Sequence, residues 1–195
     1  DNEAAFEIVF EMDSPAYMSF KHGQETTAMY VKPGDKINLS INPTEFDETI
    51  SYDGSKASNF LAKKYLVEEE LDFRELYSLE ETNFLAQVTE AESMMNGLLD
   101  SLVEGLFKTE QKRSISLQWA STKLNYKKYY EYLGNGTLEL SANYYDFVEE
   151  FNINDPSLLE NDESYSFLKT YVSSNISEEF EHVLLSNFDF ISKQF

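Results

Sequence analysis

Cysteine and histidine, two residue types that are frequent in catalytic and metal sites, are absent or rare in this chain of 195 residues. It has no cysteine, which excludes disulfides, cysteine-ligated metals and thiol nucleophiles within it. Its two histidines, His22 beside an expected hairpin turn and His182 near the carboxyl end, are far apart in the sequence. No Gly-x-Ser-x-Gly or His-Glu-x-x-His pattern is present. We therefore expect both histidines to be surface residues, and we assign no catalytic, cofactor-binding or metal-binding residue.

Acidic residues are abundant, and a carboxylate-based hydrolase stays open as a hypothesis because glycosidases use a pair of such groups. The densest glutamate runs, at residues 68–70 and 178–179, fall near expected helix ends or on polar faces, where solvated charge is the ordinary state. Residues 152–155 carry oxygen-bearing side chains but lack the spacing and the terminal glutamate of an EF-hand. We expect a turn there rather than a calcium site.

Four tyrosines, Tyr126, Tyr129, Tyr130 and Tyr132, lie within one expected helix. Tyrosine rings at helical spacing commonly pack in a core with their hydroxyls reaching its edge, and this is the expected role here. A platform on which sugar rings stack is the alternative.

Composition predicts a folded and strongly acidic protein. Hydrophobic residues make up 42% of the chain and aromatic residues 15%, which is enough apolar surface to form a core. Lys plus Arg number 15 against 36 for Asp plus Glu, giving a formal charge of −21. Such a charge repels nucleic-acid phosphates and anionic lipid headgroups. Nucleic-acid binding is therefore not expected. No apolar run approaches the roughly 20 residues that span a bilayer, so membrane insertion is not expected either.

Residues 1–54 have the patterns of short strands. A turn of type II is indicated by Lys32-Pro33-Gly34-Asp35, because proline presets its own φ and glycine accepts a positive φ. Segments that alternate with period two or are rich in β-favouring residues surround this turn, at 6–12, 17–21, 26–31, 37–41 and 49–52. The sequence therefore predicts a small antiparallel meander or half-sandwich in this part of the chain.

From residue 55 onward the period becomes helical. Ser55 or Ser58 can cap a helix that runs toward residue 71. Ser78 and Glu81 have the spacing of a capping box, which would open a long helix with an apolar stripe from residue 85 to 106.

The next expected helix, over residues 109–133, has apolar side chains on two sides and is therefore expected to have neighbours on both. Further helices are expected to begin at Ser141, Ser164 and Ser177. The predicted fold is α+β, with an antiparallel β subdomain at 1–54 and an antiparallel helical bundle at 55–195.

Charge is unevenly distributed along the helical part. Residues 66–104 hold eleven acids and one base, residues 108–130 hold six bases and one acid, and residues 139–195 hold twelve acids and two bases. The basic helix is expected to compensate its acidic neighbours through Lys112, Lys123 and Lys127. The alternative makes these lysines, with Tyr129 and Tyr130, a surface on which a partner docks.

Four segments of the chain, taken in order, resemble one family. Residues 30–39 contain the Lys-Pro-Gly-Asp hairpin, residues 45–52 read Glu-Phe-Asp-Glu-Thr-Ile-Ser-Tyr, residues 54–66 carry a Gly-to-Leu stretch with Asn59, and residues 147–159 contain Asn-Ile-Asn-Asp-Pro. Together they are similar to the amino-terminal region of TlpA-type thioredoxin-like proteins of the cell envelope. These are thiol-disulfide oxidoreductases, commonly lipoproteins, with an N-terminal β-sandwich and helical region.

The resemblance implies a location and a set of partners. In that family a Cys-x-x-Cys motif on a C-terminal thioredoxin fold does the redox chemistry, and no such residue can be assigned in this chain. We expect the chain to be the amino-terminal piece of an envelope protein on the periplasmic side. Its first one or two strands would be missing, and its partners would be the parent's thioredoxin domain and substrate proteins. A sheet edge left uncovered in this way would favour a homodimer.

The first hypothesis for function is therefore a non-catalytic module, needing no cofactor, that positions a redox domain and offers surface to partners. The second is a free-standing envelope lipoprotein that binds glycans or peptides with its tyrosine-rich helices. The third is the carboxylate hydrolase.

Overall fold

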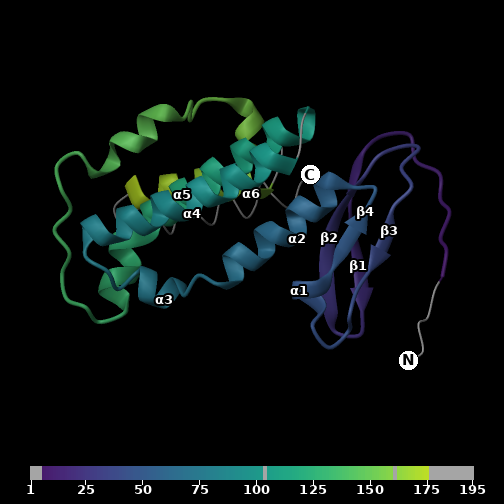
Figure 1. The fold of residues 1–195 in the computed structure, drawn as a ribbon. Coiled ribbons are helices and arrows are strands. Elements are labelled where there is room, and N and C mark those ends of the chain that lie inside the picture. Colours follow the sequence, from purple (N-terminus) through teal and green to yellow (C-terminus); the bar gives the residue numbers. More distant parts are fainter. Residues whose placement is uncertain (1–5, 103–104, 160–161, 176–195) are drawn as a thin grey trace. The chain divides into compact units, whose positions relative to one another are not determined.

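The computed structural model describes residues 6–102, 105–159 and 162–175, and it has the predicted α+β order of strands followed by helices (Figure 1). The chain forms two compact units. Unit 1 consists of Asp1–Leu71 with Gly97–Lys108, and unit 2 consists of Asp72–Asn96 with Thr109–Phe195. The predicted boundary at 54/55 marks the change of secondary structure, whereas unit 1 continues past it because the first long helix packs on the strands.

The described residues of unit 1 form two separate antiparallel sheets of two strands each. Strands β1 (Ala16–His22) and β2 (Glu25–Val31) form a hairpin in which His22 faces Glu25. Gly23 begins its two-residue turn with a φ of +63°, as a type II′ turn requires at that position. The second sheet pairs β3 (Asn38–Ser40) with β4 (Ser51–Asp53), and the one-turn helix α1 (Phe46–Thr49) lies between them in sequence.

The predicted turn between the two sheets is confirmed. The Asp35 amide donates to the Lys32 carbonyl at 3.1 Å, which closes the turn, and Gly34 has a φ of +82°. The Asp35 carboxylate also accepts a hydrogen bond from the Lys32 amide at 2.8 Å. Proline, glycine and aspartate therefore each have a structural role in the motif.

The predicted strand at residues 6–12 was wrong. No strand forms there, and Phe6, Ile8 and Val9 expose 72%, 70% and 85% of their surface. Alternating apolar residues favour a strand only where a neighbouring strand completes the main-chain hydrogen bonds, and no strand among the described residues pairs with this segment. Where the structure describes this part of the chain, from residue 6 onward, the expected five-strand meander is instead four strands in two sheets.

Helix α2 (Lys56–Glu69) completes unit 1. The Ser55 hydroxyl caps it by accepting a hydrogen bond from the Ser58 amide at 3.1 Å, which confirms the first of the two predicted caps. The core of the unit includes the rings of Tyr30, Phe60 and Phe107. Phe107 lies 4.6 Å from the Tyr30 ring and 6.0 Å from the Phe60 ring, centroid to centroid.

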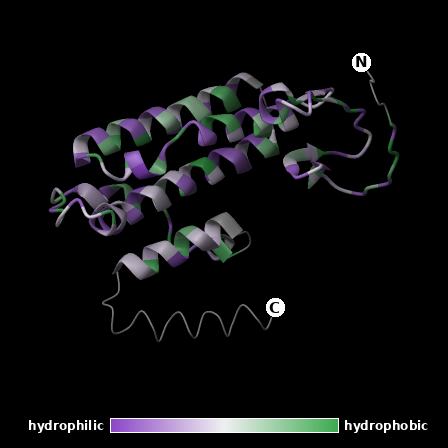
Figure 2. Cartoon of the chain, turned by 90° about the horizontal axis from the view of Figure 1, so that it is seen from below, coloured by the Kyte–Doolittle hydropathy of each residue, from purple (hydrophilic) through white to green (hydrophobic). Residues whose placement is uncertain are grey.

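The long helices α4 (Glu81–Leu102) and α5 (Leu106–Tyr132) contribute residues to both units. Phe84 near the start of α4 stacks on Tyr126 near the end of α5, with ring centroids 3.9 Å apart, so the two helices run antiparallel. Green and purple alternate along the long helices in Figure 2, as expected for helices that bury part of their surface in a core. A short helix, α3 (Phe73–Leu76), precedes them.

The carboxyl-terminal elements cover the second side of α5, as its two apolar sides predicted. They are two 3₁₀-helices, η1 (Tyr144–Glu150) and η2 (Pro156–Leu159), and the helix α6 (Asp162–Asn175). One cluster of buried side chains joins α5, η2 and α6: Leu117, Ala120, Leu124, Leu158 and Phe167.

Two predicted caps were wrong because their side chains find other partners. The Ser78 hydroxyl donates to the Arg74 carbonyl at 2.8 Å, and the Glu81 carboxylate accepts from the amide of Ser141 at 2.8 Å, so no capping box forms. The Ser141 hydroxyl also donates to Glu81, and the segment that follows it is a 3₁₀-helix rather than an α-helix. The helix predicted from Ser177 onward lies outside the described residues.

Candidate functional site

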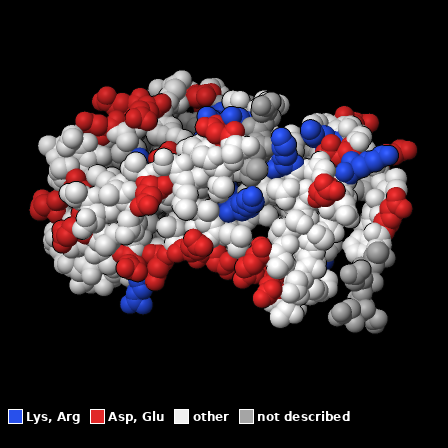
Figure 3. Space-filling model, viewed as in Figure 1, with Lys and Arg blue, Asp and Glu red and all other residues white. Residues whose placement is uncertain are grey.

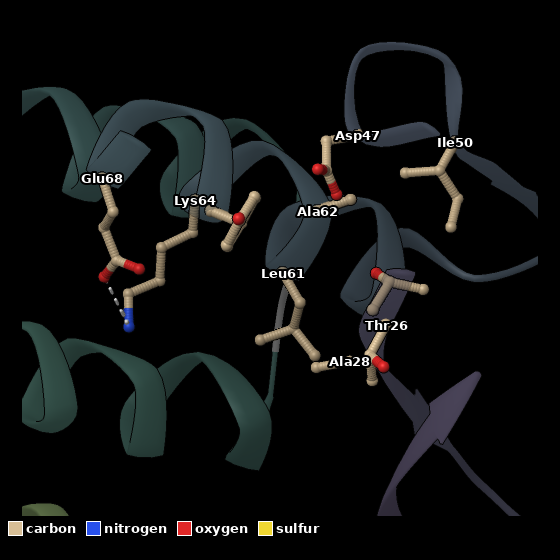
Figure 4. Close-up of a pocket in the computed structure, with 10 residues that line it drawn as sticks. Thr26, Ala28, Asp47, Ile50, Leu61, Ala62, Lys64 and Glu68 are labelled. Atoms are coloured by element: carbon tan, nitrogen blue, oxygen red, sulfur yellow. Dashed lines mark ion pairs between the residues drawn. The ribbon is translucent and has the colours of Figure 1, made fainter. Parts of the chain in front are cut away.

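A small cavity of about 190 Å³ lies in unit 1 between β2, α1 and α2. Figure 4 shows Leu61, Ala62 and Lys64 approaching it from α2, with Asp47 and Ile50 approaching from the region of α1. Its volume is below the roughly 300 Å³ at which pockets for drug-sized ligands begin. The cavity is lined by Thr26, Thr27, Ala28, Asp47, Ile50, Leu61, Ala62, Lys64, Tyr65 and Glu68.

The charged groups around this cavity are mostly acidic. Lys64 forms an ion pair with Glu68, with Nζ 3.5 Å from Oε1 (Figure 4). Desolvation, followed by the charges of Glu25 and Glu48, raises the pKa of Asp47 above its ordinary value. The neighbouring Glu69 raises the pKa of Tyr65. The cavity therefore combines an apolar floor with an acidic rim, which suits a small cationic group better than an anion.

The tyrosines that the sequence placed on one helix divide into buried and exposed residues. Tyr126 is fully buried, and its hydroxyl donates to the Leu79 carbonyl at 2.5 Å. Tyr130 is also buried, and its hydroxyl donates to the Glu80 carboxylate at 3.3 Å. Tyr129 and Tyr132 expose 42% and 83% of their surface. The core interpretation is thus confirmed for the first two, and of the four only Tyr129 and Tyr132 expose much of their rings to solvent.

Burial sets the protonation of the unit 2 tyrosines. It raises the pKa of Tyr126 to about 12, with a further contribution from the charge of Glu80. It also raises the pKa of Tyr77 to about 12, although a hydrogen bond with Thr122 acts in the opposite direction. Burial raises the pKa of Tyr144 furthest, and the hydroxyl of this residue donates to the Lys123 carbonyl at 2.8 Å. These hydroxyls are therefore held neutral as donors inside the unit.

A row of three aromatic rings forms on unit 2 that the sequence did not predict. Phe73 and Tyr77 have ring centroids 6.3 Å apart, and Tyr77 and Tyr129 have centroids 4.8 Å apart. Within this row, Phe73 exposes 37% of its surface and Tyr129 exposes 42%. Phe73 and Tyr77 are four residues apart around the short helix α3, a spacing that could have indicated a shared face. We call these three residues the aromatic row.

The basic residues proposed for docking lie along α5 and interact within unit 2. Lys123 Nζ lies 4.9 Å from the centre of the Phe147 ring. Its charge also opposes the rise that burial causes in the pKa of Glu92. Lys127 forms an ion pair with Glu131 at 3.9 Å, and Lys112 is exposed on the same helix. For Lys123 and Lys127 these contacts favour the intramolecular interpretation over the docking one.

Figure 3 shows that acidic side chains outnumber basic ones on one face of the helices. Among residues 6–102, 105–159 and 162–175, no three acidic or histidine side chains gather as a metal site would require. His22 is exposed at the end of β1, and His182 lies outside the described residues.

Polar side chains in the segments that carry the family resemblance form hydrogen bonds with main-chain groups of unit 1. The Thr49 hydroxyl accepts from the Asn42 amide at 2.9 Å. The Asn59 side chain accepts from the Tyr52 amide at 3.0 Å and donates to the Tyr52 carbonyl at 2.6 Å. Together with the Asp35 contact in the turn, these bonds fix how the strands and α2 are joined.

Comparison with protein-family models, with curated proteins and with solved structures gave no match. No helix within the described ranges is both long enough and apolar enough to cross a membrane.

Proposed function

We propose that this chain is a non-catalytic module of an envelope thioredoxin-like thiol-disulfide oxidoreductase, which positions the redox domain and presents surface to partners. The observation that supports this proposal is the use of the motif side chains. Asp35, Thr49 and Asn59 are part of the resemblance to that family, and each directs its polar atoms to main-chain groups of unit 1. Residues that serve in this way maintain a shape, which is what a positioning module requires.

The coding DNA beyond Phe195 tests this proposal. An in-frame continuation into a domain with a Cys-x-x-Cys motif is the expected result. A stop codon directly after Phe195 would remove the redox partner and with it the proposal. In a parent that carries both parts, deletion of this module is expected to leave the reduction potential of the cysteine pair unchanged while slowing reaction with substrate proteins.

The aromatic row favours a second candidate function, the binding of glycans or peptides. Half-exposed rings at 4.8 and 6.3 Å spacing offer faces on which the apolar side of a sugar ring can stack. A glycan array is the test, with Tyr129→Ala and Phe73→Ala expected to abolish any binding. Tyr132→Ala is the matched control, because Tyr132 is more exposed than either but is not part of the row.

A further inference from the structure

The hairpin in unit 1 has one outer edge that is covered by side chains. Ser58 accepts a hydrogen bond from the Tyr30 amide at 3.0 Å and donates to the Tyr30 carbonyl at 3.1 Å. The Tyr52 hydroxyl reaches the Ala28 carbonyl at 3.4 Å. Tyr30 and Ala28 therefore direct their main-chain groups away from β1, and residues of α2 and β4 occupy that edge of β2.

The register then determines which main-chain groups of β1 point outward. In an antiparallel pair, residues directly opposite each other either exchange both hydrogen bonds or both point away. Tyr17 lies opposite Tyr30, Ser19 opposite Ala28, and Lys21 opposite Thr26. The outer edge of β1 is therefore formed by the main chains of Tyr17, Ser19 and Lys21. Among the described residues no strand other than β2 pairs with β1, and Ser19 and Lys21 are exposed.

Strand β1 lacks the acidic residues that are abundant in the rest of the chain. The chain holds 36 acidic residues, yet Ala16–His22 contains none, and Lys21 is its one lysine. Natural edge strands are commonly protected by charged side chains, by proline or by a bulge. In β1 a single lysine near one end is the only such device, so the central residues can pair with another strand.

The edge is also complementary to itself. If two copies of β1 lie antiparallel about a two-fold axis at Ser19, the two Ser19 main chains form a hydrogen-bonded pair. Lys21 of each copy then lies across from the half-exposed Tyr17 ring of the other, a favourable pairing of a cation with an aromatic face. Met18 of each copy lies across from Phe20 of the other, which is a favourable apolar cross-strand pair.

We propose that β1 pairs with β1 of a second copy of this chain, so that two hairpins form one continuous four-stranded sheet. The proposal is independent of the function proposed above, because it rests on the edge of one hairpin and requires no redox domain. An interface built from one seven-residue strand is small, so the dimer is expected to be weak and concentration-dependent. Added salt is expected to strengthen it, because each copy has a charge of −21.

Sedimentation equilibrium over a range of protein concentration tests this dimer. The average mass should rise from 22.6 kDa toward twice that value as the concentration increases. Ser19→Pro should raise the dissociation constant at least about tenfold, equivalent to about 1.4 kcal/mol, because proline removes an amide at the centre of the pairing. The Ser19 amide points away from β2, so the same change removes no hydrogen bond within the hairpin. Ser19→Thr is the matched control and should leave dimerisation intact.

A second measurement remains valid even if the Ser19→Pro variant does not fold. The chain has no cysteine, so Ser19→Cys gives a unique site for a nitroxide spin label. Dipolar broadening between labels is expected at high concentration and should disappear on dilution with unlabelled protein. The label at Ser101→Cys, on the exposed side of α4, should show none. A chain that stays monomeric up to millimolar concentration would overturn the proposal. So would a dimer that Ser19→Pro leaves unaffected, or one in which labels at position 19 show no broadening.

Discussion

The hydroxyl of Ser58 hydrogen bonds to both main-chain groups of Tyr30, a residue 28 positions earlier in the sequence, at 3.0 and 3.1 Å. One side chain in the first turn of α2 therefore joins that helix to the edge of β2. The Ser55 hydroxyl lies 2.9 Å from Ser58 Oγ and supports it from the cap position. All of these groups are buried, so water cannot replace the bonds.

Ser58→Ala is expected to destabilise unit 1 by about 1 to 3 kcal/mol, because it leaves the Tyr30 amide buried without its partner. Urea unfolding followed by circular dichroism measures the change. Ser101→Ala is the control, since the Ser101 hydroxyl is exposed and donates only to a carbonyl of its own helix. A loss no larger than that of the control would show that the joint contributes nothing to stability.

Two glycines with similar backbone angles should respond differently to alanine. Gly54 has a φ of +94°, and a Cβ there would clash with the Lys36 carbonyl oxygen. Gly34 has a φ of +82° with no atom near the position of a Cβ. Gly34→Ala should cost about 1 to 2 kcal/mol for the left-handed conformation alone, and Gly54→Ala clearly more because the main chain must also move. Thermal unfolding of the two variants compares them directly, and equal losses would mean that the Lys36 carbonyl yields freely.

The buried tyrosines predict a loss of stability at high pH. In the unfolded chain tyrosine ionises near pH 10, whereas Tyr77 and Tyr126 keep their protons until about pH 12. Their contribution is fully present below pH 10 and is lost as the pH rises toward 12, because only the unfolded state releases protons in that window. Absorbance at 295 nm should show Tyr77 and Tyr126 ionising together with unfolding.

The Tyr126→Phe variant tests this assignment. It should reduce the change in absorbance that accompanies unfolding at high pH. If that change were unaffected, the Tyr126 hydroxyl would not be one of the groups that ionise on unfolding.

Charge reversal on α5 separates the two interpretations of its lysines. Lys123→Glu removes the cation from the Phe147 ring and adds a negative charge near Glu92, so a loss of roughly 1 kcal/mol in stability is expected. Lys127→Glu breaks an exposed pair with Glu131 and should cost about 0.5 kcal/mol or less. Chemical unfolding measures both changes. Unchanged stability in Lys123→Glu, combined with loss of a partner, would favour the docking surface instead.

Local features of the fold could be predicted from the sequence, because neighbouring residues determine them. The hairpin turn at Gly23, the closed turn at Lys32 to Asp35 and the cap at Ser55 each depend on residues only a few positions apart. Burial of Tyr126 followed from helical spacing in the same way.

Features that depend on distant residues could not be predicted. Glu81 bonds Ser141 across 60 positions, and this partner, rather than Ser78, determines how the carboxylate is used. Residues 6–12 have the pattern of a strand, but a pattern does not supply a neighbouring strand. The aromatic row and the cavity bring together side chains from separate elements, and the spacing within any one element indicated only part of each.

Phe107 belongs to α5 yet packs against Tyr17, Tyr30 and Phe60, which all precede residue 61. During synthesis the hairpin and α2 leave the ribosome well before this ring does. At the roughly 5 to 20 residues per second typical of translation, their core lacks the Phe107 ring for a few seconds after they have been made. The strands of this protein can thus reach their final stability only after the whole of α4 has been made.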